Sequence, residues 1–177
     1  EISVLLEIKG ENTFKIRAYE NGARALERSS ESLETLVGEG RLAELDGVGE
    51  ALAKKIETLY RSGRLDYYED LKAEIPDGLR RMAEIPGLGG KTVHRLNAEL
   101  GVGSIEELRE ACESGKVAAL KGFGEKSASK ILKGIENLER FSRRRLLSRA
   151  EEAAGPILEG LRGLAGVRKA EVAGSLR

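Results

Sequence analysis

The chain has 177 residues, and its 30 Lys and Arg are balanced by 30 Asp and Glu, so the formal net charge is zero. This balance excludes a uniformly basic binder of nucleic acid or membrane, and any anion site must come from local clusters or backbone amides. The single cysteine and single histidine, Cys112 and His94, exclude an internal disulfide and a Cys/His-rich zinc site.

The first part of the chain is predicted to be helical. Apolar residues recur at helical spacing over residues 2–8 and 14–26, where Phe14 opens the second stripe, and a short apolar segment follows at 33–37. Amphipathic helices are expected over 50–60 and over 65–75, and Pro76 should end the latter.

One short motif occurs three times, as LDGVGEALAKKI at 45–56, IPGLGGKTVHRL at 85–96 and LKGFGEKSASKI at 120–131. Two glycines flank one apolar residue, which is Val48, Leu88 or Phe123, and a helical pattern follows each time. Glycine permits a positive φ without a Cβ penalty, and the apolar residue can pack between the two helices. Each turn would then present free backbone N–H groups at a helix start, which is a site for a phosphate.

The repeat resembles the helix–hairpin–helix motif, which binds DNA without reading its sequence. The resemblance implies that the turn glycines and a lysine after the second and third turns contact DNA phosphates: Gly47, Gly49, Gly87, Gly89, Lys91, Gly122, Gly124 and Lys126. Further basic residues follow the turns at Lys54, Arg95 and Lys130.

The remaining elements complete an all-α prediction with one short terminal strand. Ser104 and Glu107 form a capping box before a helix over 105–112. Helices are expected over 126–140 and 145–164, and Pro156 should kink or break the second. Residues 167–173 are strand-like. Cys112 lies on an amphipathic helix and is expected to be buried and inert.

Three segments carry a closer resemblance. FKIRAYENGARAL at 14–26, the first hairpin with the following SGRL, and VAGSLR at 172–177 resemble, in order and spacing, the N-terminal part of a bacterial family X DNA polymerase, related to polymerase beta. The implied domains are a lyase-like helical domain at 1–75, a fingers domain at 76–142 with the second and third hairpins, and the start of a truncated palm at 143–177.

This resemblance implies roles for individual residues. Lys55 falls at the lysine that forms a Schiff base with a 5′-deoxyribose phosphate, and Lys15 and Tyr19 fall at phosphate-pocket positions. Gly174 and Ser175 match the pair that holds the nucleotide triphosphate. Ala51 and Phe14 replace a pocket lysine and a histidine of the animal enzymes, so weak lyase activity is expected.

The resemblance also implies ions. Main-chain carbonyls of the first two hairpins would hold Na⁺ or K⁺: Ala43, Leu45 and Val48 in the first, and Ala83, Ile85 and Leu88 in the second. Mg²⁺ or Mn²⁺ would bind only to palm carboxylates expected beyond Arg177.

The implied function is gap-filling DNA repair synthesis, with two metal ions at the palm. Expected partners are gapped or nicked duplex DNA with a 5′-phosphate and, for the full-length protein, a deoxynucleoside triphosphate. The protein is expected to be a monomer. It is expected in the bacterial cytoplasm and nucleoid, because no apolar run approaches ~18 residues and no signal peptide opens the chain. We expect the chain to be part of a longer protein, because it begins within an apparent helix and stops after a strand-like run.

Two other functions fit the repeats. The first is a non-catalytic hairpin module that tethers another DNA-processing protein to DNA, and a Gly-Asp-x-Asp pattern after Arg177 would instead favour a polymerase. The second is a helical protein-interaction domain in which the glycine turns are structural, and binding to gapped duplex would exclude it.

Overall fold

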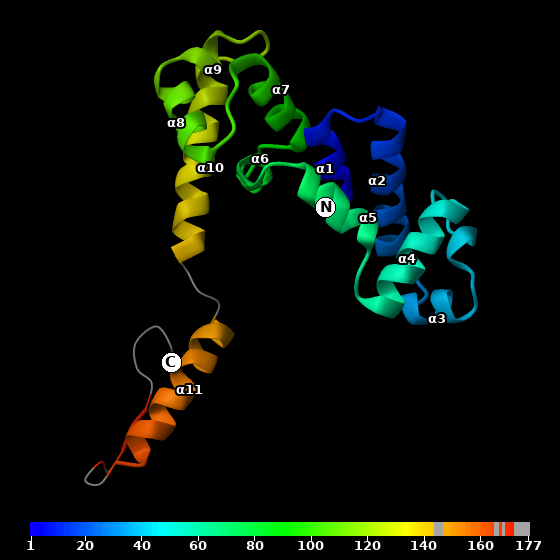
Figure 1. The fold of residues 1–177 in the computed structure, drawn as a ribbon, viewed down its shortest axis with the longest axis vertical. Coiled ribbons are helices and arrows are strands. Elements are labelled where there is room, and N and C mark those ends of the chain that lie inside the picture. The colour runs from blue at the N-terminus through cyan, green and yellow to red at the C-terminus, as the bar shows by residue number, and fades with distance from the viewer. Residues whose placement is uncertain (144–146, 165–166, 168, 172–177) are drawn as a thin grey trace. The chain divides into compact units, whose positions relative to one another are not determined.

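The computed structural model describes residues 1–143, 147–164, 167 and 169–171. The elements of these residues are helices joined by short turns (Figure 1). They are α1 (Ile2–Lys9), α2 (Thr13–Arg28), α3 (Leu33–Gly38), the 3₁₀ helix η1 (Leu42–Glu44), α4 (Glu50–Ser62), α5 (Asp66–Glu74), α6 (Asp77–Met82), α7 (Gly90–Leu100), α8 (Ile105–Glu113), α9 (Lys116–Ala119), α10 (Glu125–Arg143) and α11 (Leu147–Arg162). The predicted all-α fold is therefore confirmed.

The predicted terminal strand is not seen in the described residues. Of residues 167–173, the described ones, Val167, Lys169, Ala170 and Glu171, form no strand, and the other three lie outside the described residues. A strand needs a partner for its backbone groups. Here the Ala170 carbonyl instead accepts hydrogen bonds from Nε and Nη2 of Arg162, at 3.1 and 2.9 Å.

Backbone contacts divide the chain into two units, Glu1–Ile135 and Glu136–Arg177. In the first unit, α1 packs against α7 and α2 and also contacts α5 and α6. The predicted end of a helix at Pro76 is confirmed, since α5 ends at Glu74. Helix α1 contacts helices on both sides of Pro76. The division into two domains at residue 75 stays a prediction.

A glycine allows α7 to lie directly on α1. A Cβ atom at Gly90 would lie 2.6 Å from the Val4 carbonyl oxygen and 2.7 Å from the Glu7 Cβ. Four residues further along α7, Nδ1 of His94 lies 3.0 Å from the Ile8 carbonyl oxygen. These contacts fix the helix of the second repeat against α1.

Local sequence sets several helix starts. The side chains of Asn12, Ser32 and Ser104 accept hydrogen bonds from first-turn amides of α2, α3 and α8. The predicted capping by Ser104 is confirmed, but the Glu107 carboxylate accepts from the N–H of Gly103, at 2.7 Å, rather than from that of Ser104. Such caps stabilise a helix by about 1 kcal/mol each.

Cys112 is buried, as predicted, with 6% of its surface exposed. Burial, with a smaller contribution from the negative charge of Glu113, raises the pKa of its thiol to about 11. The reactive thiolate is therefore scarce at neutral pH, which agrees with an inert cysteine.

In the second unit, α11 continues through Pro156. The predicted break of the helix at this proline is therefore wrong. Ile157, Leu161 and Leu164 of this unit are exposed. None of the helices in the described residues is both long and apolar enough to span a membrane.

Candidate nucleic-acid interface

The three repeats fold into the same turn. The first glycine of each motif has a left-handed φ, at +89° for Gly47 and +84° for both Gly87 and Gly122. The next residue then donates its N–H back across the turn, in the pairs Val48 to Leu45, Leu88 to Ile85 and Phe123 to Leu120, at 2.9, 2.9 and 3.0 Å. The predicted positive φ is confirmed for the first glycine of each motif but not for the second, since Gly49 and Gly89 have φ values of −78° and −79°.

The apolar residue of each turn anchors it to the helices. Val48 and Leu88 are 3% and 4% exposed, as predicted for residues that pack between two helices. Phe123 is only half-buried. Its ring instead stacks with the guanidinium of Arg95, whose Cζ lies 5.0 Å from the ring centroid.

The helix starts behind these turns are open. Gly49 and Gly89 precede α4 and α7, and no side chain caps either helix. In each repeat, the carbonyl of the second glycine accepts from the amides three and four residues later. Among the described backbone hydrogen bonds at these turns, the amides of residues 49–51, 89–91 and 124–126 are not donors. No atom outside the turn lies within 4 Å of a Cβ placed at Gly49, Gly89 or Gly124. These N–H groups are therefore available to an anion, although at the start of α7 the Glu7 carboxylate lies 3.0 Å from a Cβ placed at Gly90.

Lysines stand beside two of these helix starts. Lys126 is exposed on the first turn of α10. Nζ of Lys91 lies 3.7 Å from the Glu7 carboxylate, but its side chain is 68% exposed. The Glu7 side chain is only 13% exposed, but the exposed ammonium of Lys91 makes no hydrogen bond to it among those described, so Lys91 remains able to bind a phosphate.

Arg95, one of the basic residues that follow the second turn, joins the second and third hairpins. Its Nη2 donates to the Lys121 carbonyl at 2.9 Å, its guanidinium covers Phe123, and its Nε donates to Glu99 at 2.9 Å. The flat face of a guanidinium can stack on a ring while its edge donates several hydrogen bonds in fixed directions.

Replacing Arg95 with alanine should loosen the third turn. We expect amide hydrogen exchange of Phe123 to accelerate by about tenfold, which corresponds to the ~1.4 kcal/mol of a lost carbonyl bond and ring contact. The amides of Val48 and Leu88, which make the same bond in the other turns, are internal controls and should not change. Restoration of slow exchange by Arg95→Lys would contradict this role.

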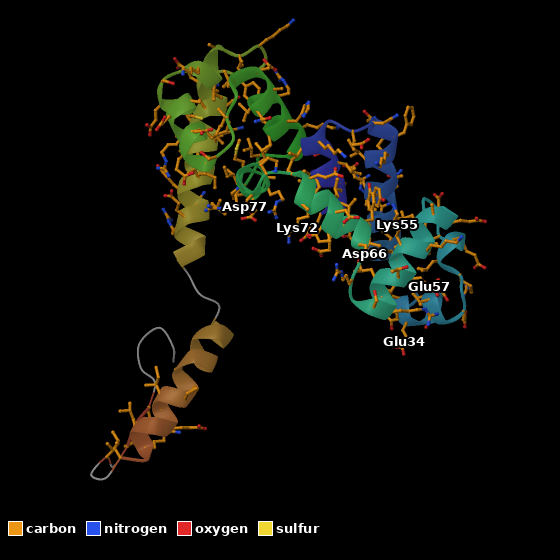
Figure 2. The ribbon with its side chains drawn as sticks, in the orientation of Figure 1. Glu34, Lys55, Glu57, Asp66, Lys72 and Asp77 are labelled. Atoms are coloured by element: carbon orange, nitrogen blue, oxygen red, sulfur yellow. The ribbon has the colours of Figure 1, made fainter. Side chains whose placement is uncertain are left out.

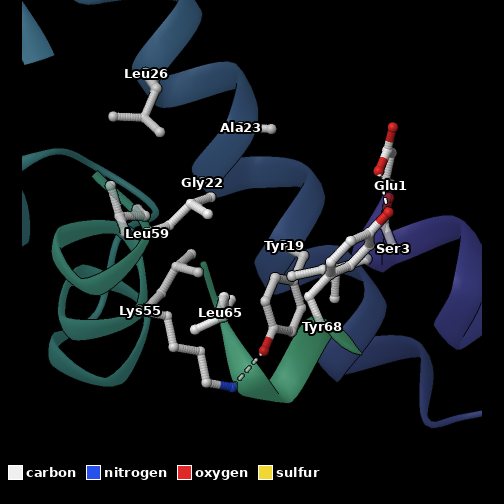
Figure 3. A pocket seen from close by; sticks show the side chains of 13 residues that line it. Glu1, Ser3, Tyr19, Gly22, Ala23, Leu26, Lys55, Leu59, Leu65 and Tyr68 are labelled. Carbon is white, nitrogen blue, oxygen red and sulfur yellow. Dashed lines mark hydrogen bonds between the residues drawn. The ribbon is translucent and has the colours of Figure 1, made fainter. Parts of the chain in front are cut away.

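A second cluster of cations lies away from the turns. Lys15 and Tyr19 of α2 and Lys55 of α4 were predicted to share a pocket, and the structure brings Tyr19 and Lys55 into contact. Figure 2 shows Lys55 on α4. Nζ of Lys55 donates to the Tyr19 hydroxyl at 2.5 Å (Figure 3). A cavity of about 390 Å³ adjoins this bond, and apolar side chains of α2 and α4 form much of its wall.

Sequence reasoning missed one member of this cluster, Tyr67 on the first turn of α5. Its ring is parallel to that of Tyr19, with centroids 6.1 Å apart and an interplanar angle of 4°. Nζ of Lys55 lies 3.7 Å from the Tyr67 ring centroid, and Nζ of Lys15 lies 5.8 Å from it. Tyr67 therefore connects the two predicted lysines.

Glu11 holds Lys15 in this cluster, with 3.3 Å between its carboxylate oxygen and Nζ of Lys15. Burial lowers the pKa of Lys15, but the hydrogen bond to Glu11 and the contact with Tyr67 outweigh it, so the pKa is raised. The hydrogen bond from Lys15 in turn lowers the pKa of Glu11. Both groups are therefore charged at neutral pH.

Other predicted positions have separate outcomes. Phe14 does not join the apolar face of α2 but is 80% exposed, because Ile16 takes the buried position in that turn. Gly174 and Ser175 lie outside the described residues. Of the carbonyls predicted to hold a monovalent cation, those of Leu45 and Ile85 each accept one turn hydrogen bond.

Comparisons with known proteins agree with this geometry. Residues 1–65 match the family described as helix-hairpin-helix domain, and residues 39–100 and 79–137 match the family described as SAM-like helix-hairpin-helix tandem. The tandem matches together cover more than half of the chain. The chain belongs to the helix–hairpin–helix tandem family.

Two relatives share longer segments. The chain is 38% identical over 176 residues, 99% of its length, to DNA polymerase/3′-5′ exonuclease PolX of Bacillus subtilis strain 168. It is 35% identical over 121 residues, 64% of its length, to a DNA ligase of Ectopseudomonas mendocina strain ymp. The chain spans 30% of the first protein and 15% of the second. The resemblance to the N-terminal part of a family X polymerase is therefore confirmed.

Proposed function

We propose that this chain binds gapped duplex DNA through backbone phosphates, as the front part of a family X DNA polymerase that fills gaps during repair. The observation that carries the proposal is the threefold turn with open first-turn amides at residues 49–51, 89–91 and 124–126. Amides at a helix start bind phosphate without a net positive charge, which suits a chain whose formal net charge is zero. The similarity to PolX over 99% of the chain supports the polymerase assignment over the tethering module.

Binding to a gapped duplex tests this function. If two hairpins together neutralise three or four phosphates, log affinity should fall with log salt concentration with a slope of roughly −3. Fluorescence anisotropy across a salt series, on two duplexes of different sequence, measures both the slope and the sequence preference. A slope near zero, or strong preference for one sequence, would contradict phosphate binding by the turns.

A single turn can be tested separately with Gly87→Val. A β-branched residue at φ +84° is strained by roughly 1–3 kcal/mol, so the turn should change conformation and lose its phosphate. We expect affinity to fall about tenfold and the salt slope to become shallower by about 1. The matched control is Gly101→Val, at φ +71° at the opposite end of α7, which should be strained similarly but bind DNA like the wild type.

The cluster at Lys15, Tyr19 and Lys55 would receive the 5′-phosphate at the far side of the gap. Two ammonium groups near one ring, that of Tyr67, support binding of an anion there. In this proposal Lys55 carries weak 5′-deoxyribose phosphate lyase activity, since it is the lysine at the centre of the cluster.

The finer assignments extend the same proposal. Main-chain oxygens of the first two hairpins would hold Na⁺ or K⁺, and the carbonyls of Leu45 and Ile85 each keep one lone pair for this. Mg²⁺ or Mn²⁺ and the nucleotide triphosphate would bind to palm residues of the whole polymerase, which would act as a monomer in the bacterial cytoplasm.

A further inference from the structure

Tyr67 holds a position that the proposed function does not use. Its ring faces the ammonium of Lys55 at 3.7 Å and that of Lys15 at 5.8 Å. The ammonium of Lys55 therefore lies between the Tyr67 ring face and the Tyr19 hydroxyl, to which it donates. The parallel ring of Tyr19 supports Tyr67 from the side.

This arrangement fixes two side chains that are otherwise among the most mobile. A lysine normally loses much rotamer freedom when it binds an anion, and that loss weakens binding. The face of an aromatic ring attracts an ammonium, so it holds the lysine in place before the anion arrives. Two cations held in one place favour a terminal phosphate monoester, with up to two negative charges, over an internal phosphodiester with one.

The hydroxyl of Tyr67 provides a second observation. It is buried and makes no hydrogen bond of normal geometry with the described residues, although its interaction with the Lys15 ammonium helps to raise the pKa of that lysine. Buried hydroxyls nearly always have a partner, and a missing one calls for an explanation. The interaction with the Lys15 ammonium is such an explanation, and it helps to hold that side chain beside the ring.

We propose that Tyr67 is the positioning residue of a site specific for a terminal phosphate monoester. Its ring fixes the ammonium groups of Lys15 and Lys55, which then bind the phosphate. This inference rests on the proposed function, in which the cluster faces the 5′ end at a gap, and it adds the residue that makes the site discriminate between phosphate and hydroxyl at that end.

The test compares two gapped duplexes that differ only in a 5′-phosphate or a 5′-hydroxyl at the downstream strand. The ratio of their dissociation constants is the 5′-phosphate preference. In the wild type we expect a preference of about tenfold, and in Tyr67→Leu a fall to about twofold or less. Tyr67→Phe keeps the ring, so most of the preference should remain. Tyr60→Leu is the matched control, because Tyr60 is a 44% exposed tyrosine on the helix of Lys55, and its preference should not change.

The outcomes distinguish a failure of the inference about Tyr67 from a failure of the proposed function. An unchanged preference in Tyr67→Leu would overturn the inference, and so would a loss in Tyr67→Phe as complete as in Tyr67→Leu, since the ring would then have no role. A wild type that binds gapped DNA but ignores the 5′ end would overturn the assignment of the cluster. Affinity for the 5′-hydroxyl duplex, which the hairpins provide, reports whether each variant is folded.

Discussion

Replacing Gly78 with alanine should destabilise the first unit by about 3 kcal/mol, because the new methyl group has no space. A Cβ atom at Gly78 would lie 1.9 Å from the carbonyl oxygen of Gly103 and 3.4 Å from the Cα of Ser104. These are backbone atoms immediately before α8, so no change of side-chain rotamer can relieve the overlap. Relief requires α6 and α8 to move apart, which would disturb the packing between them.

Urea unfolding monitored by circular dichroism measures this loss. The matched control is Gly38→Ala at the end of α3, where no neighbouring atom lies within 4 Å of the new Cβ. Alanine has a higher helix propensity than glycine, so the control should be neutral or up to about 1 kcal/mol more stable. A Gly78→Ala protein that unfolds within 0.5 kcal/mol of the wild type, on the order of measurement scatter, would refute the close contact between α6 and α8.

The sequence predicts features that neighbouring residues determine. The three turns follow from a glycine, an apolar residue and a second glycine, because one positive φ and one short hydrogen bond close each turn. The cap at Ser104 and the helix end before Pro76 are equally local. These features need no information from distant parts of the chain.

Features that depend on distant contacts were not predicted. Nothing in the spacing of α1 and α7 indicates that Gly90 lies on Val4, since their contact depends on how the helices pack. The contacts of Arg95 were not predicted for the same reason, because Lys121 and Phe123 belong to the next repeat.

The cation cluster shows both cases. Lys15 and Tyr19 share a face of α2 because they are four residues apart, which the sequence reveals. Their proximity to Lys55 was expected only from the resemblance to the family, and Tyr67 was missed altogether. The two adjacent tyrosines at the start of α5 contact different neighbours. The ring of Tyr67 lies against Nζ of Lys55, whereas the Tyr68 hydroxyl donates to Glu1. No pattern within α5 distinguishes them.

Lys55→Ala should abolish covalent trapping of an incised abasic site. In the proposed lyase step, the Lys55 ammonium first loses a proton to water, and the free amine attacks the aldehyde carbon of the 5′-deoxyribose phosphate. Water then leaves, and borohydride reduces the resulting imine to a stable secondary amine. Lys55 is the amine best placed for this attack, because the Tyr19 hydroxyl and the Tyr67 ring hold it in the cluster. Pairing with Glu11 helps to raise the pKa of Lys15 and so keeps it charged. Lys15 is therefore expected to hold the phosphate rather than to attack the aldehyde.

Two variants make the trapping experiment specific. Lys54→Ala removes the adjacent, exposed lysine of α4 and should leave the adduct yield unchanged. Lys15→Ala should lower the yield by weakening phosphate binding, and a higher substrate concentration should restore it. We expect a low yield even from the wild type, because Ala51 provides no further cation beside Lys55. An adduct that survives Lys55→Ala undiminished would move the nucleophile to another lysine, and the absence of any wild-type adduct would leave the cluster as a phosphate site without lyase chemistry.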